Sequence, residues 1–110
     1  MPARLRVELT LGAEQDLSLI HRYLLQPRSE LDADALLARV LDAAQSLETY
    51  PERGPVPPEL AALGIRDYRQ LIIAPYRLLY RVIDDTAYIV LIADGRRNMR
   101  QLLEQRLVRP

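Results

Sequence analysis

The stretch YRLLYRVIDDTAYIVLIADGRRN, residues 76–98, decides the fold. Two apolar-rich runs, residues 76–83 and 86–93, are separated only by Asp84-Asp85, a spacing typical of an antiparallel hairpin. Both alternating sets of side chains in the second run are apolar or aromatic: Tyr88, Val90 and Ile92 on one side, and Ala87, Ile89, Leu91 and Ala93 on the other. This pattern predicts a central strand that is covered on both faces.

The segments on either side of this hairpin add one more strand and a final helix. Residues 65–73 form a third apolar-rich run, and only Ala74-Pro75 separates it from the hairpin, so the three runs predict an antiparallel meander. After the meander, Asn98 can cap a last helix, with Gln101 three residues on, as in a capping box. The apolar side of that helix is expected to hold Met99, Leu102, Leu103 and Leu107.

The first half of the chain reads as a strand followed by two helices. Residues 4–9 alternate charged and apolar side chains, the period of a half-buried strand. Thr10 can cap a first helix, whose apolar residues recur at steps of three and four. A second apolar stripe predicts another helix that starts near Ser29 or Asp32 and ends before Pro51.

A proline-rich segment joins these helices to the meander. Four prolines and a glycine fall within residues 51–58, which predicts a connecting loop. We therefore expect an α+β fold in a single domain spanning residues 1–110: an N-terminal strand, a two-helix hairpin, a three-stranded antiparallel meander and a short C-terminal helix. The two helices would cover one face of the sheet, and either the last helix or a partner protein would cover the other.

Composition and charge restrict the classes of function. Absence of cysteine excludes disulfides, thiolate nucleophiles and cysteine-ligated zinc. Residues 1–8 lack the apolar core of a signal peptide and no later stretch resembles a membrane span, so we expect a cytoplasmic protein without membrane contact. The net charge is zero, yet residues 59–110 hold nine Arg against six acidic residues, so an anionic partner is expected to meet this half.

No residue pattern predicts a metal, a cofactor or a hydrolytic centre. The chain contains no HExxH, no glycine-rich phosphate loop and no GxSxG motif. His21, the sole histidine, lies beside the core stripe of the first predicted helix and is expected on the helix surface rather than as a catalytic base. Five arginines remain as candidates for binding a target or an anion, unless they are solvated or internally paired: Arg66, Arg77, Arg81, Arg96 and Arg97.

The order of short motifs resembles that of the RelE/ParE toxins of type II toxin–antitoxin systems over nearly the whole chain. The strongest part is the YRLLYRV strand at 76–82 followed by the GRR turn at 95–97. The other matching motifs are Ala13-x-x-Asp16-Leu17-x-x-Ile20-x-x-Tyr23, Leu47-x-x-Tyr50-Pro51-x-x-Gly54 and Gly64-Ile65-Arg66. The resemblance implies a toxin that a cognate antitoxin neutralises by covering its sheet and an apolar groove.

Such an antitoxin would account for a spare apolar face on the sheet. The candidate contacts lie on the central strand, its neighbour and the last helix: Leu79, Tyr88, Val90, Ile92, Met99 and Leu103. A homodimer is a further alternative for the partner.

The family divides by target, and the resemblance alone implies both branches. RelE-like members cleave mRNA in the ribosome, whereas ParE-like members are not enzymes and inhibit DNA gyrase. The ribonucleases draw catalytic groups from Lys, Arg, His, Glu and Tyr, but this chain has no Lys, has no His after His21, and carries Asp94 where the commonest family turn has His. We therefore favour a ParE-like gyrase inhibitor, with a ribosome-dependent mRNA endoribonuclease as the alternative.

Overall fold

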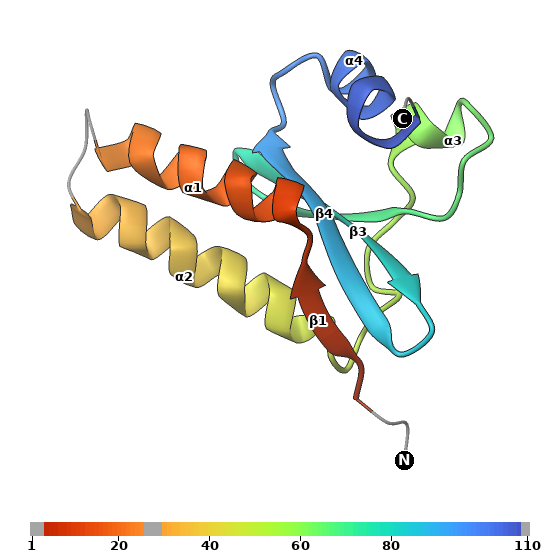
Figure 1. Cartoon of the computed structure of the whole chain (residues 1–110), viewed down its shortest axis with the longest axis horizontal. Coiled ribbons are helices and arrows are strands. Elements are labelled where there is room, and N and C mark those ends of the chain that lie inside the picture. The colour runs from red at the N-terminus through yellow and green to blue at the C-terminus, as the bar shows by residue number, and fades with distance from the viewer. Residues whose placement is uncertain (1–3, 26–29, 109–110) are drawn as a thin grey trace.

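The computed structural model describes residues 4–25 and 30–108. It confirms the predicted α+β architecture and adds a short helix before the meander. The elements in chain order are β1 (Arg6–Leu9), α1 (Leu11–Leu25), α2 (Glu30–Ser46), α3 (Pro58–Ala61), β2 (Arg69–Ile73), β3 (Tyr76–Ile83), β4 (Thr86–Asp94), α4 (Met99–Leu103) and the π-helical turn η1 (Glu104–Val108) (Figure 1).

The helix starts and strand ends differ from the prediction in a few places. Ser29, one of the two expected starts of the second helix, lies outside the described residues, and α2 is described from Glu30. Of the apolar-rich run at residues 65–73, only Arg69–Ile73 forms a strand. Ile65 is not part of that strand, because its N–H donates to Leu60 O at the end of α3. Leu5 is likewise outside β1, since its N–H donates to Glu48 O.

The four strands form one sheet in the order β1-β4-β3-β2. Strands β2, β3 and β4 make the predicted antiparallel meander. Strand β1 pairs in parallel with the other edge of β4, from Arg6 opposite Thr86 to Leu9 opposite Ile89. Strand β4 is therefore central, as the two apolar sets of side chains predicted.

Two apolar layers enclose the sheet. On one face, α1 and α2 pack against buried strand residues, with Leu36 and Val40 in the same cluster as Leu78, Tyr80 and Ile89. Figure 1 shows these two long helices side by side, while α3 and α4 lie together at the other side of the strands. The chain thus uses its longest helices for the larger of its two cores.

The second face is covered by the chain's own short helices. Leu60 of α3 and Met99 and Leu103 of α4 cluster with Leu79 and Leu91 of the strands. Of the two alternatives for this face, the last helix is therefore the one found, with α3 beside it.

The predicted alternation of side chains along β4 is wrong from Val90 onward, because the strand contains a bulge there. Leu79 pairs with Leu91 and Tyr80 pairs with Ile89, so Val90 is skipped in the register. An extra residue shifts which face the following side chains occupy. Val90 and Leu91 consequently pack in the α3–α4 layer, and Ile92 packs in the α1–α2 layer, opposite the face predicted for it.

Side chains complete the hydrogen bonding of β4 where it extends past β1. Ile92 N–H donates to Asp16 Oδ2 at 3.1 Å, and Arg106 Nη2 donates to Val90 O at 3.1 Å. Arg106 also binds Asp16 through both terminal nitrogens, at 3.0 and 3.1 Å. This network ties the last turn of the chain to α1 and to the bulge. Within the described residues, none of the helices has the length and apolarity needed to cross a membrane.

Candidate functional site

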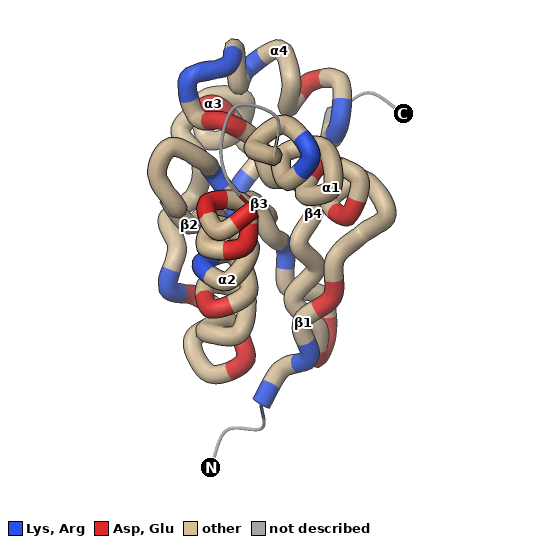
Figure 2. Tube along the Cα trace, turned by 90° about the vertical axis from the view of Figure 1, so that its left-hand side faces the viewer, with Lys and Arg blue, Asp and Glu red and all other residues tan. Residues whose placement is uncertain are grey.

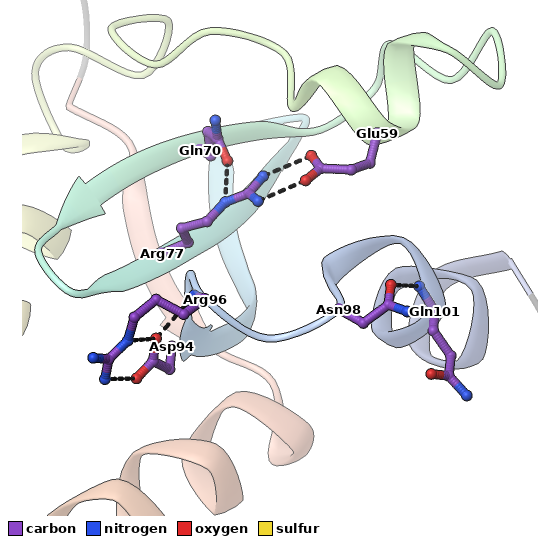
Figure 3. Close-up of polar contacts among 7 residues, drawn as sticks. All are labelled: Glu59, Gln70, Arg77, Asp94, Arg96, Asn98 and Gln101. Atoms are coloured by element: carbon purple, nitrogen blue, oxygen red, sulfur yellow. Dashed lines mark hydrogen bonds and ion pairs between the residues drawn. The ribbon is translucent and has the colours of Figure 1, made fainter.

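The turn from β4 to α4 is organised by Asp94. The backbone N–H and the Nε of Arg96 both donate to Asp94 Oδ1 at 2.9 Å, and Arg96 Nη2 donates to Oδ2 at 2.6 Å (Figure 3). These bonds lower the pKa of Asp94 to about 2, so its carboxylate is ionised at neutral pH. Arg97 is exposed, and its side chain makes no hydrogen bond or ion pair within the described residues.

The turn ends at the predicted cap of the last helix. Asn98 Oδ1 accepts a hydrogen bond from Gln101 N–H at 3.1 Å (Figure 3). Gly95 also donates its N–H to Pro75 O at 2.8 Å, which ties the turn to the β2–β3 connection. The positions of the Arg96 and Arg97 backbones are therefore fixed from both sides.

Arg77 lies beside this turn but is fully engaged inside the chain. Its guanidinium makes a two-pronged pair with Glu59 of α3, at 2.7 and 2.8 Å, and its Nε donates to Gln70 Oε1 at 2.7 Å (Figure 3). The Arg77 side chain is only 11% exposed, and its hydrogen bond is the main cause of the lowered pKa of Glu59. Arg77 therefore fastens α3 to the sheet rather than facing a target.

The remaining candidate arginines lie at the opposite end of β3. Arg81 is 40% exposed, sits 5.6 Å from the ring centre of Tyr68, and approaches Asp67 at 3.7 Å. Arg66 directly precedes Asp67 and is exposed. Arg77 and Arg81 are four residues apart, roughly 13 Å along a strand. The five predicted arginines are thus split between two ends of the sheet and do not form one anion site.

A groove of about 780 Å³ opens between the α1–α2 hairpin and the β4–α4 turn. We refer to it as the hairpin groove. The residues that line it come from α1, α2, the β2–β3 connection with the start of β3, and β4 with its following turn: Asp16, Leu19, Ile20, Tyr23, Leu24, Asp32, Ala35, Leu36, Arg39, Pro75, Tyr76, Ile92, Ala93, Asp94, Arg96 and Arg97. Two of the predicted arginines, Arg96 and Arg97, therefore belong to a concave site.

Sequence reasoning missed the helical wall of this groove. Leu19, Tyr23 and Arg39 were not among the predicted site residues, yet all three line it. A signal was present, because Leu19 and Tyr23 are four residues apart and lie off the apolar stripe that faces the core. Arg39 gave no such signal, since one arginine on a helix surface is usually solvated.

Neither Tyr80 nor His21 lines the hairpin groove. Tyr80 is completely buried, its hydroxyl oxygen accepts the N–H of Gly54 at 3.2 Å, and burial raises its pKa. His21 Nε2 lies 3.2 Å from Asp34 Oδ1, between the two long helices. Among the described residues, no group of three His, Cys, Asp or Glu side chains could hold a metal ion.

Most of the predicted antitoxin contacts are inside the folded chain. Leu79, Met99 and Leu103 are at most 4% exposed in the α3–α4 layer, and Ile92 is buried against the α1–α2 layer. Leu79, Met99 and Leu103 can meet a partner only if the layer over them moves, whereas Ile92 also lines the hairpin groove. Val90 and Tyr88 are half-buried, so part of their surface remains accessible.

Comparisons with known proteins agree with this architecture. The family model described as the ParE toxin of type II toxin–antitoxin systems, parDE, matches residues 7–99. No curated protein sequence matches the chain.

Two solved structures share the fold. The first is the chromosomal ParDE toxin–antitoxin system from P. aeruginosa, with a TM-score of 0.69 and 17% identity over 83% of this chain and 96% of that chain. The second is the toxin–antitoxin complex RelBE2 from Mycobacterium tuberculosis, with a TM-score of 0.59 and 25% identity over 86% of this chain and 94% of that chain. Since the family model spans most of the sequence and the fold agrees, the chain belongs to the ParE toxin family of type II toxin–antitoxin systems, within the RelE/ParE superfamily.

Proposed function

We propose that this toxin inhibits DNA gyrase in the cytoplasm and that a cognate antitoxin neutralises it. The match to the ParE toxin model over residues 7–99 carries the proposal. The exposed Arg66 and Arg97 and the half-buried Arg81 are the proposed contacts with the target, whereas Arg77 is buried in its pair with Glu59.

The chemistry of the sheet supports binding rather than RNA cleavage. Cleavage at a 2′-hydroxyl needs a general base and a general acid within hydrogen-bond reach of the substrate. Tyr80 is buried with a raised pKa, His21 lies between α1 and α2, and an arginine with a pKa above about 12 is a poor base. Inhibition by surface complementarity needs none of these groups.

A ribosome-dependent mRNA endoribonuclease is the second candidate. The likeness to the RelBE2 complex favours it, as does the position of Arg81 over the ring of Tyr68. Arginines next to an aromatic ring can hold a phosphate backbone and a stacked base.

The two candidates differ in what happens in a cell that makes the toxin without its antitoxin. We expect a reporter plasmid to lose negative supercoils before growth stops, while primer extension on abundant mRNAs shows no new 5′ ends. Co-expression of the cognate antitoxin is the control and should restore both supercoiling and growth. New mRNA ends with normal plasmid supercoiling would instead identify a ribonuclease.

A further inference from the structure

Strand β2 is one edge of the sheet, since β3 is its only neighbour in the strand order. The backbone groups of an antiparallel edge strand point alternately toward the neighbouring strand and away from the sheet. Gln70 N–H points away, because it donates to Pro55 O of the proline-rich loop at 2.9 Å. Ile72 lies two residues further along, so its N–H and C=O point the same way. Within the described residues, they make no backbone hydrogen bond outside the sheet.

The side chain at this open position is apolar. Ile72 is 63% exposed, although its neighbours Leu71 and Ile73 are buried against the long helices. Proteins commonly protect edge strands with charged side chains, with proline or with a covering segment, because unpaired N–H and C=O groups are a template for another chain. Ile72 supplies neither charge nor proline, so protection of this edge has to come from elsewhere in the chain.

A segment of the proline-rich loop, residues 52–55, covers the first half of the edge. We refer to it as the edge loop. Arg69 Nη1 donates to Gly54 O at 2.8 Å and to Glu52 O at 3.3 Å, and Gly54 N–H donates to Tyr80 Oη at 3.2 Å. A Cβ on the buried Gly54 would collide with Gln70 O, so only glycine lets the loop backbone approach β2 this closely.

Without the edge loop, β2 would be complementary to itself. In an antiparallel pair of two copies centred on Leu71, Gln70 of each copy faces Ile72 of the other. Both residues turn their N–H and C=O outward, so each such pair can exchange both of its N–H···O bonds. The register needs no residue beyond Arg69–Ile73. Gln70 cannot take part while Pro55 O accepts its N–H.

We propose that the edge loop prevents β2 from pairing with β2 of a second copy of this chain. While the loop is docked, Ile72 is the open position of the edge, and one residue is too short for stable strand pairing. Release of the loop exposes a self-complementary strand with an apolar side chain at its centre. This role concerns the toxin freed from its antitoxin and does not depend on which target the toxin inhibits.

Displacement of the loop tests the proposal. The wild-type toxin should sediment as a single chain of 12.6 kDa, whereas Gly54→Val should form a dimer as its concentration rises. At concentrations where Gly54→Val is still monomeric, the Gln70 amide should exchange about tenfold faster than in the wild type, because its bond to Pro55 O is lost. Arg69→Met, which keeps the glycine but removes the donor to the loop carbonyls, should change both quantities in the same direction.

A proline at the open position separates strand pairing from simple loss of stability. Ile72→Pro removes the outward N–H and leaves the bonds between β2 and β3 in place, since proline is tolerated where an edge strand's N–H faces solvent. The variant Gly54→Val with Ile72→Pro should therefore remain monomeric, although its loop is displaced. Dimerisation of this double variant would mean that destabilisation causes the association, and would contradict the proposal.

Single cysteines test the location of the contact, because the chain has no cysteine of its own. With a short bismaleimide, Ile72→Cys should give a crosslinked dimer in the Gly54→Val background and little in the wild-type background. Leu41→Cys is the matched control, since Leu41 of α2 is 51% exposed and lies outside the sheet, and it should give no such dimer in either background.

Three results would overturn the proposed role. The first is a Gly54→Val chain that stays monomeric although its Gln70 amide exchanges fast. The second is an unchanged Gln70 exchange rate in that variant, which would mean that the loop does not close the edge. The third is equally efficient crosslinking through residue 72 with Gly54 in place.

Discussion

Arg77 and Arg81 look equivalent in the sequence and have different roles in the structure. Both occupy alternate positions of β3, but Arg77 is 11% exposed in its pair with Glu59 and Arg81 is 40% exposed beside Asp67. Strand alternation could predict that the two side chains share a face of the sheet, but not their different exposure or partners. The partner of Arg77 lies 18 residues away on a helix whose placement depends on the proline-rich loop, and local sequence patterns do not encode that distance.

Removal of the Arg77 guanidinium should destabilise the fold. We expect Arg77→Met to lower the free energy of unfolding by about 2–3 kcal/mol, because Glu59 and Gln70 lose their hydrogen-bond donor in a partly buried place. Arg81→Met should cost less than about 1 kcal/mol, since its ion pair is long and exposed. Urea denaturation of both variants measures the difference, and equal losses would show that the Glu59 pair contributes no more than a surface contact.

The same pair predicts a pH dependence. Arg77 lowers the pKa of Glu59 from its ordinary value of 4.5, so the folded state favours the ionised carboxylate. The stabilisation is complete above that value and is lost as the pH falls through the lower pKa of the folded state. The stability difference between wild type and Glu59→Gln should therefore shrink as the pH falls below about 4.5. A difference that stays constant from neutral pH into this range would contradict the assignment.

Among the elements, the last helix is held by the Asn98 cap, which the sequence predicted, and by the Arg106–Asp16 pair, which it did not. The cap at Asn98 follows from a local pattern, and its bond to Gln101 N–H is present. The pair of Arg106 with Asp16 joins residues 90 positions apart, so only the tertiary structure brings it about. The bulge at Val90, which gives Arg106 a carbonyl to bind, also has no signature in the alternating strand pattern.

Loss of the cap should be measurable on its own. Asn98→Ala leaves Gln101 N–H without its side-chain acceptor and should cost about 1 kcal/mol of unfolding free energy. Asn98→Ser, which keeps an acceptor at the cap, should recover most of this loss. Thermal or urea unfolding compares the two, and equal stability of the Ala and Ser variants would mean that the cap has no energetic role.

Loss of the Arg106 side chain should speed hydrogen exchange at backbone amides that the Asn98 cap does not protect. Arg106→Gln removes the pair with Asp16 and the bond to Val90 O, so we expect faster hydrogen exchange at the amides of α4 and η1 and at Ile92. Arg100→Gln is the control, because the Arg100 ion pair with Glu104 is a 3.6 Å surface contact on the same helix. Unchanged protection of α4 in Arg106→Gln would rule out this anchoring role.

For the whole molecule, the pattern of apolar residues predicted that the sheet is covered on both faces. It did not predict which surfaces remain accessible to a partner. The alternating apolar sets of residues 86–93 predicted a strand covered on both faces, and α1–α2 and α3–α4 provide those covers. Because the chain covers both faces itself, Leu79 and Met99 are not an open docking face, whereas the hairpin groove is a concave surface that remains accessible. Its walls come from four separate parts of the chain, so no contiguous motif could reveal it.

The charge distribution of the whole molecule bears on the target. The net charge is zero, and Figure 2 shows Arg interspersed with Asp and Glu rather than gathered on one face. Binding of nucleic acid without sequence preference depends on a basic surface that neutralises phosphates. This distribution supports a protein target, which shape and a few arginines can recognise.

Supercoiling by purified gyrase tests the proposed inhibition most directly. The toxin, freed from its antitoxin, is titrated into a gyrase reaction on relaxed plasmid and, in parallel, into a translation reaction with purified ribosomes and a defined mRNA. We expect a dose-dependent loss of supercoiling that stoichiometric antitoxin reverses, with the mRNA intact. Cleavage of the mRNA at toxin concentrations that leave supercoiling unchanged would contradict it.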